Sequence, residues 1–230
     1  MKDFQLIVNF KTYDNATGNN ALELAKIHEK VAQETGVGIA IAVQAVDLRH
    51  VAEEVSIPVL AQHFDFVRNG VHTGHVTAQA LKDSGAYGTL LNHAERRIDL
   101  DDIEESVDLA RQLGLFTIVC ADTPYTGKAV AALNPHMVAV EPPELIGGDV
   151  SVCTANPQIL MDAVAMIDNA PVVIGAGIKT KEDVAHAIKH GASAVLVASG
   201  VIRSMDPEQT LRELAQGVIE GQKGAVEHTL

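Results

Sequence analysis

Short runs of apolar residues alternate with longer amphipathic segments along the whole chain. The runs place Val, Ile, Leu and Ala at consecutive positions, which is typical of strands buried on both faces of a parallel sheet. We therefore predict strands over residues 5–9, 38–43, 59–62, 88–92, 116–121, 137–141, 172–175 and 194–198.

The segments between these strands carry apolar residues at helical spacing, and turn residues mark some of their ends. Gly36 is placed to end the first helix, and Pro207 stands in the first turn of the last one. The pattern predicts helices over residues 20–34, 101–113, 155–167, 181–189 and 206–220, with shorter helices after the second, third and fifth strands. Residues 63–75 show no strong helical pattern, and a loop of that length is usually functional or part of an interface.

Eight strands, each followed by a helix or a helical turn without a linker, predict an α/β fold. We expect a closed eight-stranded parallel β/α barrel, with residues 1–230 forming a single domain. An open, doubly wound parallel sheet gives the same alternation and is the alternative architecture.

The chain is acidic, with a formal net charge of −13 at pH 7. Nucleic acids and anionic bilayers repel such a surface, so we expect neither a nucleic-acid nor a membrane partner. Any anionic substrate must then be held by a local cationic or backbone-amide site. Cys120 and Cys153 have neither a disulfide framework nor metal-ligand spacing, which favours a reducing, cytoplasmic location.

Polar side chains cluster where the predicted strands end, which is the face of a β/α barrel that carries active residues. Asn9 and Lys11 stand at the end of the first strand, and the period of two points them to the same side. His93 and Glu95 follow the fourth strand, and the sixth strand ends in Glu141. A surface lysine or a structural histidine is the simpler interpretation of each residue alone, whereas the set indicates a catalytic site.

Residues 142–149 have the composition of a lid over that site. Pro142 and Pro143 stiffen the exit from the sixth strand, and Gly147 and Gly148 give the other end conformational freedom. Such a segment closes over a site without moving the strand before it. Glu141 would lie at its base, where a general base is useful; a turn with a surface acid is the simpler alternative.

Two segments of small residues, 175–178 and 198–201, follow the seventh and eighth strands. They let backbone N–H groups approach an anion, and a short helix beginning near Ser199 would direct its amino terminus at it, which favours a phosphate site. His63, His72 and His75 lack a carboxylate or cysteine at ligand spacing, so no metal is expected. The residues favour proton abstraction beside the carbonyl of a small phosphorylated compound, without a cofactor.

These motifs occur in the order found in triosephosphate isomerases, and the chain most resembles the short archaeal-type branch of that family from about residue 5 to residue 220. The lid sequence is the most specific of them. The matching segments are residues 9–11 (NFK), 72–75 (HTGH), 92–97 (NHAERR), 140–147 (VEPPELIG), 175–178 (GAGI) and 198–201 (ASGV).

The resemblance implies an isomerase that interconverts dihydroxyacetone phosphate and D-glyceraldehyde 3-phosphate through an enediolate, in glycolysis and gluconeogenesis. Glu141 would move the proton and His93 would polarise the carbonyl. Lys11, with Asn9 beside it, would bind the substrate, and Glu95 would be a supporting carboxylate. The other residues expected to bind the substrate, largely through backbone amides at its phosphate group, are Ile146, Gly147, Gly175, Gly177, Ser199 and Gly200.

The resemblance also implies an assembly. Thr73 matches the family position that reaches into the site of a neighbouring subunit, so a homodimer or homotetramer is expected. Arg97 would be a structural ion-pair partner.

Some residues depart from the family pattern, and they bear on lid movement and phosphate affinity rather than on the reaction type. Ala94 stands where Ser is usual, Gly148-Asp149 replaces Thr-Gly, and Lys179 stands where Ser is common.

Two other functions fit parts of the pattern. Another phosphate-binding β/α-barrel isomerase or synthase would share the two segments of small residues but has no need of the lid sequence. A non-catalytic relative that binds a phosphometabolite would not need Lys11, His93 and Glu141 together.

Overall fold

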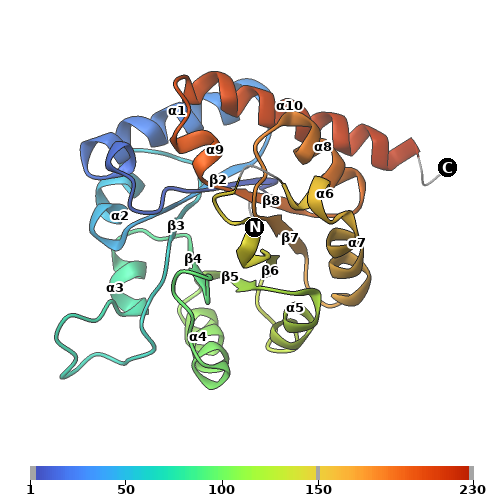
Figure 1. The fold of residues 1–230 in the computed structure, drawn as a ribbon. Coiled ribbons are helices and arrows are strands. Elements are labelled where there is room, and N and C mark those ends of the chain that lie inside the picture. The colour runs from blue at the N-terminus through green and yellow to red at the C-terminus, as the bar shows by residue number, and fades with distance from the viewer. Residues whose placement is uncertain (1–3, 149–150, 228–230) are drawn as a thin grey trace.

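Parallel strands close into a barrel at the centre of the molecule, and helices surround it (Figure 1). The computed structural model describes residues 4–148 and 151–227. Over these residues eight strands follow one another around the barrel in chain order, and β1 pairs with β8. The closed barrel is confirmed and the open sheet is wrong. The strands are β1 (Leu6–Asn9), β2 (Ile39–Val43), β3 (Val59–Ala61), β4 (Gly88–Leu91), β5 (Phe116–Ala121), β6 (Met137–Val140), β7 (Val172–Gly175) and β8 (Ala194–Val197).

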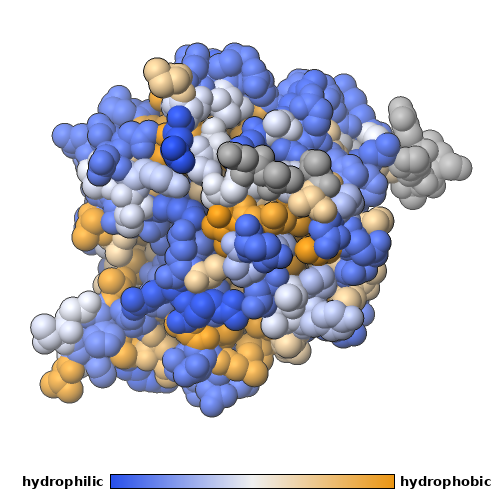
Figure 2. Space-filling model, in the orientation of Figure 1, coloured by the Kyte–Doolittle hydropathy of each residue, from blue (hydrophilic) through white to orange (hydrophobic). Residues whose placement is uncertain are grey.

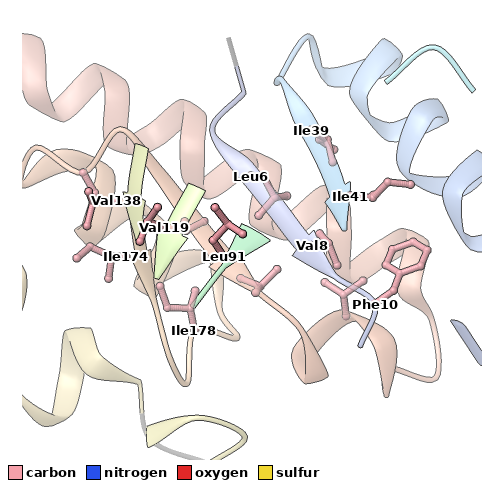
Figure 3. Close-up of a cluster of buried hydrophobic side chains, with 14 of the residues drawn as sticks. Leu6, Val8, Phe10, Ile39, Ile41, Leu91, Val119, Val138, Ile174 and Ile178 are labelled. Atoms are coloured by element: carbon pink, nitrogen blue, oxygen red, sulfur yellow. The ribbon is translucent and has the colours of Figure 1, made fainter. Parts of the chain in front are cut away.

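Successive residues of each strand point in turn to the interior of the barrel and to the surrounding helices. Ile7, Leu90 and Ile118 belong to a buried cluster that fills the interior. Because the period of two continues past the strand ends, Asn9 and Glu141 extend inward-facing rows and reach the open end of the barrel. The strand residues that alternate with the inward-facing ones point outward and pack against the helices in a second, larger cluster. Figure 3 shows part of this outer cluster, including Leu6, Val8, Ile39, Ile41, Val119 and Val138.

Helices follow the strands as the sequence predicted, with α2, α3 and α5 short. Gly36 ends the first long helix at φ +72°, and its N–H donates to the Ala32 carbonyl. Over the described residues the helical elements are η1 (Asp14–Ala16), α1 (Asn19–Thr35), α2 (Ala45–Ala52), α3 (Ala78–Asp83), α4 (Leu100–Gln112), α5 (Pro124–Ala131), η2 (Pro143–Leu145), α6 (Val152–Ala155), α7 (Pro157–Met166), α8 (Lys181–Lys189), α9 (Ser199–Ile202) and α10 (Pro207–Glu227).

The helix predicted over residues 155–167 is wrong as a single element. The chain forms α6 and α7 instead, and Asn156 between them has φ −151° and ψ 77°. Pro157 has no N–H to donate and its ring clashes with a preceding helical turn, so it begins a new helix. The break separates α6, which follows the lid, from α7, which packs on the barrel.

The last helix, α10, lies close against α8 because glycines face the contact. A Cβ on Gly217 would meet the Lys181 carbonyl oxygen at 2.4 Å, and one on Gly221 would meet the Ala185 carbonyl oxygen at 2.8 Å. These approaches exclude any side chain at either position, so the two glycines set the distance between the helices.

The loop of residues 63–76 has neither helix nor strand and projects from the body of the molecule, in teal at the lower left of Figure 1. Its base is closed by the Asp65 N–H, which donates to the Val76 carbonyl at 2.8 Å. Val71 near its tip is fully exposed (100%).

The surface in the same view is mainly hydrophilic, with a compact apolar area near the middle (Figure 2). Across residues 4–148 and 151–227, no helix is both long and apolar enough to cross a lipid bilayer.

Candidate active site

A pocket at the carboxyl ends of the strands collects most of the residues that the sequence singled out. They come from the ends of β1, β4, β6, β7 and β8, so only closure of the barrel brings them together. The predicted residues in its lining are Asn9, Lys11, His93, Glu141, Ile146, Gly147, Gly177 and Ser199.

Lys11 is held in an uncommon backbone conformation just after β1. Its φ of +48° lies in the left-handed region, which is costly for a residue with a side chain. The Lys11 N–H donates to Asn9 Oδ1 at 3.0 Å, and Gln62 Nε2 donates to the Lys11 carbonyl at 2.9 Å. These contacts fix the direction in which the lysine side chain leaves the strand.

His93 is positioned by its neighbour Asn92, which also has a left-handed φ of +57°. Asn92 Nδ2 donates to the Cys120 carbonyl at 3.0 Å, and its Oδ1 accepts from the Ile98 N–H at 3.1 Å. The buried amide therefore ties the segment that carries His93 to β5 and fixes the exit from β4.

The hydrogen bonds of His93 assign its tautomer. The Glu95 N–H donates to His93 Nδ1 at 3.1 Å, so Nδ1 is the acceptor and the neutral ring carries its proton on Nε2. Burial, and then the charge of Lys11, lower the pKa of His93. The ring is accordingly a neutral N–H donor at neutral pH. Its Nε2 lies 3.7 Å from Glu141 Oε1, which is beyond hydrogen-bond distance.

Glu141 continues the pairing of β6 beyond the strand, since its N–H donates to the Ala121 carbonyl at 2.8 Å. The residue is buried (6% exposed), and Oε1 has no hydrogen-bond partner among the described residues. Burial raises the pKa of Glu141 to about 7, although a hydrogen bond from the Cys120 thiol and the charge of Lys11 act in the opposite direction. A buried carboxylate with a free oxygen and a pKa near neutrality suits a general base.

The carboxylate of Glu141 rests on the backbone of Gly175. A Cβ on Gly175 would meet Glu141 Cγ at 2.6 Å and Oε2 at 2.7 Å. Gly175, which the resemblance assigned to substrate binding, does not line the pocket and instead gives the carboxylate its room.

Glu95 joins the group through Lys11. Its Oε1 lies 2.7 Å from Lys11 Nζ and its Oε2 lies 3.7 Å from His93 Nδ1, with more than half of the side chain exposed (56%). Arg97 pairs with Asp122 at 3.3 Å, away from the pocket lining.

The segments of small residues lie on the side of the pocket formed by β7 and β8. Gly177, at φ +71°, belongs to the β7 loop (residues 176–180), and Ser199 begins the short helix α9. Gly200 does not line the pocket, and a Cβ there would meet Lys179 Cγ at 3.2 Å, so this glycine makes room for the Lys179 stem. The arrangement gives the backbone amides the access that an anion requires.

The lid begins as predicted with two stiff residues. Pro142 has φ −57°, Pro143 opens η2, and Gly147 adopts φ +71°. Ile146 and Gly147 reach the pocket lining. Gly148 closes the turn by donating its N–H to the Leu145 carbonyl at 3.1 Å, whereas Asp149, the predicted end of the lid, lies outside the described residues.

The structure places Thr73 at the exposed tip of the 63–76 loop, apart from the pocket of its own chain. The rings of His72 and His75 lie edge to face there, 5.7 Å apart. Within the described ranges, no group of three or more His, Cys, Asp or Glu side chains is arranged to hold a metal ion.

Among the residues of this site, the sequence analysis missed Cys120, Gln62 and Tyr13, the last of which lines the pocket. Cys120 faces the barrel interior two positions after Ile118, so the period of two could have placed it near Glu141. For Gln62, the only signal in the sequence was its position at the end of a predicted strand. Ala176 belongs to a predicted segment of small residues, but its φ of +75° is typical of glycine and could not be predicted for an alanine.

The chain is similar in sequence to known proteins over most of its length. The family model described as "Triosephosphate isomerase" matches residues 4–216. A triosephosphate isomerase of Methanocaldococcus jannaschii is 48% identical over 213 residues, covering 91% of this chain and 97% of that protein. One of Methanobacterium bryantii is 46% identical over 217 residues, covering 93% and 96%. One of Methanothermobacter thermautotrophicus is 45% identical over 223 residues, covering 95% and 97%.

Proposed function

The chain belongs to the triosephosphate isomerase family, and from that premise we propose that Glu141, His93 and Lys11 carry out its reaction. The chain is an isomerase that interconverts dihydroxyacetone phosphate and D-glyceraldehyde 3-phosphate. The convergence of a buried carboxylate, a neutral imidazole N–H and an ammonium group on one pocket supports these roles most directly.

Glu141 acts as the base. Its carboxylate removes a proton from the carbon beside the carbonyl, the electron pair forms the carbon–carbon double bond of an enediolate, and the carbonyl oxygen takes the negative charge. A proton then passes from the hydroxyl oxygen of the enediolate to the charged oxygen, and Glu141 returns the carbon-bound proton to the neighbouring carbon. The former hydroxyl oxygen becomes the carbonyl, so ketose and aldose interconvert with no net change in atoms. A pKa of about 7 makes the carboxylate a stronger base than an ordinary glutamate and leaves about half of it ionised at neutral pH.

His93 and Lys11 meet the charge that develops on the substrate oxygens. The Nε2–H of His93 is held in one tautomer by the bond to Nδ1, and Lys11 is fixed by its backbone contacts, so both donors are in place before the reaction begins. Donors that need no rearrangement stabilise the enediolate more than mobile ones do. Asn9 fixes the lysine, and Glu95 holds its ammonium group.

The phosphate group is proposed to bind on the other side of the pocket. Gly177, Ser199 and Gly147 offer backbone N–H groups there, and Gly200 is assigned to the same site through the start of α9. The lid would exclude water, since an enediolate exposed to solvent expels phosphate instead of completing the isomerisation.

We propose further that the chain acts in the cytoplasm as a homodimer or homotetramer, with residues 1–230 as a single barrel domain. Thr73 would lie in the subunit interface. The exposure of residues 69–75 and of Val71 in particular supports an interface at this loop. Both cysteines are free and buried, which suits a reducing compartment.

A coupled assay of D-glyceraldehyde 3-phosphate turnover tests the assignment. We expect the purified chain to be active, and His93→Ala and Lys11→Met each to lose at least roughly 10²-fold in kcat/KM, the usual cost of removing one such donor. His50→Ala and Lys26→Met, on the exposed faces of α2 and α1, are matched controls and should retain full activity. Near-normal turnover by His93→Ala or Lys11→Met would remove that residue from its role, and an inactive purified chain would favour a non-catalytic relative.

A further inference from the structure

Asp183, in the first turn of α8, joins two segments that are far apart in the chain. Its carboxylate accepts a hydrogen bond from Ser151 Oγ at 2.5 Å, just beyond the lid. It also accepts from the Lys179 N–H at 3.2 Å and the Thr180 N–H at 3.1 Å, both in the β7 loop. The Asp183 carbonyl accepts from Cys153 Sγ at 3.6 Å.

Helix capping explains only part of this arrangement. Thr180 and Asp183 form a capping box, in which the Thr180 side chain accepts from the Asp183 N–H and Asp183 accepts from the Thr180 N–H. The bonds from Ser151 and Cys153 lie outside the box, because these residues precede α8 by about thirty positions. A cap alone needs neither of them.

A second contact joins the same two segments at the other end of the β7 loop. The Val152 N–H donates to the Ala176 carbonyl at 3.1 Å. Ala176 has a left-handed φ of +75° and is followed by Gly177, which lines the pocket. Residues 151–153, which we call the lid exit, are thus bonded to the first residue of the β7 loop and, through Asp183, to its last residues.

We propose that Asp183 is a positioning residue that couples the lid exit to the β7 loop, so that phosphate bound at the loop orders the lid through Ser151. The inference rests on the proposed function, since it takes Gly177 and Ser199 as the phosphate site. Ser151 is buried (4% exposed) and Asp183 is half-buried, and a hydrogen bond to a charged carboxylate is stronger than one between neutral groups. Coupling between two sites is reciprocal, so a lid exit held by Asp183 also favours phosphate binding.

Hydrogen exchange at the backbone amides of residues 151–155 measures the coupling directly, with saturating inorganic phosphate as the probe. In the native chain, phosphate should slow exchange of these amides by roughly 10-fold, the size expected of one hydrogen bond to a charged group. Ser151→Ala should remove most of this effect while leaving exchange in the barrel strands unchanged. The matched control is Thr180→Ala, which breaks a bond to the same Asp183 but leaves Ser151 in place, and it should keep the phosphate effect.

Kinetics give a second readout that a purely structural role would not move. With an uncoupled lid, more enediolate should lose its phosphate: the bond from C3 to the phosphate oxygen breaks, and the oxygen leaves with the electron pair. We expect Ser151→Ala to raise the ratio of phosphate release to isomerisation by roughly 5- to 10-fold, and Thr180→Ala to leave this ratio unchanged.

Several results would overturn the proposal. Phosphate-dependent protection in Ser151→Ala equal to that of the native chain would remove Ser151 from the coupling, and equal loss in Thr180→Ala would reduce Asp183 to a helix cap. Asp183→Asn provides a check at the acceptor itself and should weaken the coupling without abolishing the cap, because the amide oxygen still accepts. An inactive native chain would instead contradict the proposed function, so the two failures are distinguishable.

Discussion

The proposed role of Glu141 as the base ties the pH range of the reaction to the environment of this residue. Burial raises its pKa to about 7 from an ordinary value of 4.5, and the base must be ionised to remove a proton. We therefore expect kcat/KM to fall as the pH decreases through about 7, where an ordinary glutamate would give a fall near 4.5. A profile of kcat/KM between pH 4 and pH 9 measures this limb.

Cys120 provides the control for that limb. Its thiol hydrogen-bonds the carboxylate and favours the ionised form, so Cys120→Ala should move the limb to higher pH and Cys120→Ser should leave it nearly in place. A limb at the same pH in Cys120→Ala would mean that this hydrogen bond does not tune the base.

At the scale of the elements, β7 ends in a glycine where the Glu141 side chain occupies the space beside it. Gly175→Ala would place a Cβ 2.6–2.7 Å from the Glu141 side chain, so the carboxylate must move by a few tenths of an ångström or more. Displacement of a reacting group by about 1 Å costs roughly 10²-fold in rate. We expect a loss of that order in kcat, with the melting temperature little changed.

Gly70→Ala is the matched control for this prediction. A Cβ at Gly70 would come no closer than 3.9 Å to a described atom, so activity should stay at the native level. Full activity of Gly175→Ala would show that Glu141 does not need its present position.

From the contact between α8 and α10 we predict that a glycine-to-alanine substitution changes the free energy of unfolding differently at two positions of α10. Gly217→Ala would press a Cβ against the Lys181 carbonyl at 2.4 Å and should lower the free energy of unfolding by about 1–3 kcal/mol. Gly224→Ala would meet only the flexible Lys189 stem at 3.3 Å and should be neutral or raise the free energy of unfolding by up to about 1 kcal/mol. Urea unfolding of both variants checks the contrast; equal effects would contradict the packing described for α10.

The elements that the sequence predicted well are those whose boundaries follow from local chemistry. Because both faces of each strand are buried, its residues form a continuous apolar run in the sequence. Each strand ends within one residue of its prediction. The single helix predicted over residues 155–167 was wrong because the prediction followed the helical spacing of the apolar residues and ignored Pro157. A proline at that position ends the preceding helix and begins a new one.

The site was predictable where a motif follows a strand end, as for Lys11, His93 and Glu141. It was not predictable where a contact depends on the register of distant segments. Gln62 holds the Lys11 carbonyl, and Asp183 holds Ser151, only because barrel closure brings separate loops to the same face. Nothing in the local sequence of either residue carries that information.

At the scale of the whole molecule, His28 and Glu141 have opposite effects on stability. Burial lowers the pKa of His28 to about 4 from 6.5. Between these pH values His28 is protonated in the unfolded chain but neutral in the folded chain. The free energy of unfolding therefore falls as the pH decreases from 6.5 to about 4. Glu141 does the reverse, because its folded carboxyl keeps a proton up to about pH 7, and the free energy of unfolding falls as the pH rises from 4.5 to 7.

His28→Leu separates the two contributions. The variant removes a buried ring whose Nε2 has no partner in the described part of the chain. On going from pH 7.5 to pH 5, the change in the free energy of unfolding should be more favourable in the variant than in the native chain, by about 2 kcal/mol at most. Urea unfolding at the two pH values gives the difference, and an identical change in both proteins would mean that His28 is not the group that titrates.

The most direct test of the account compares two glutamates three residues apart. Glu141→Asp withdraws the buried carboxylate by about 1 Å and should lower kcat/KM for D-glyceraldehyde 3-phosphate by roughly 10²-fold. Glu144→Asp makes the same chemical change on an exposed side chain of η2 and should change kcat/KM by less than about 3-fold. If Glu141→Asp retained turnover within the same 3-fold limit, Glu141 would not be the group that moves the proton.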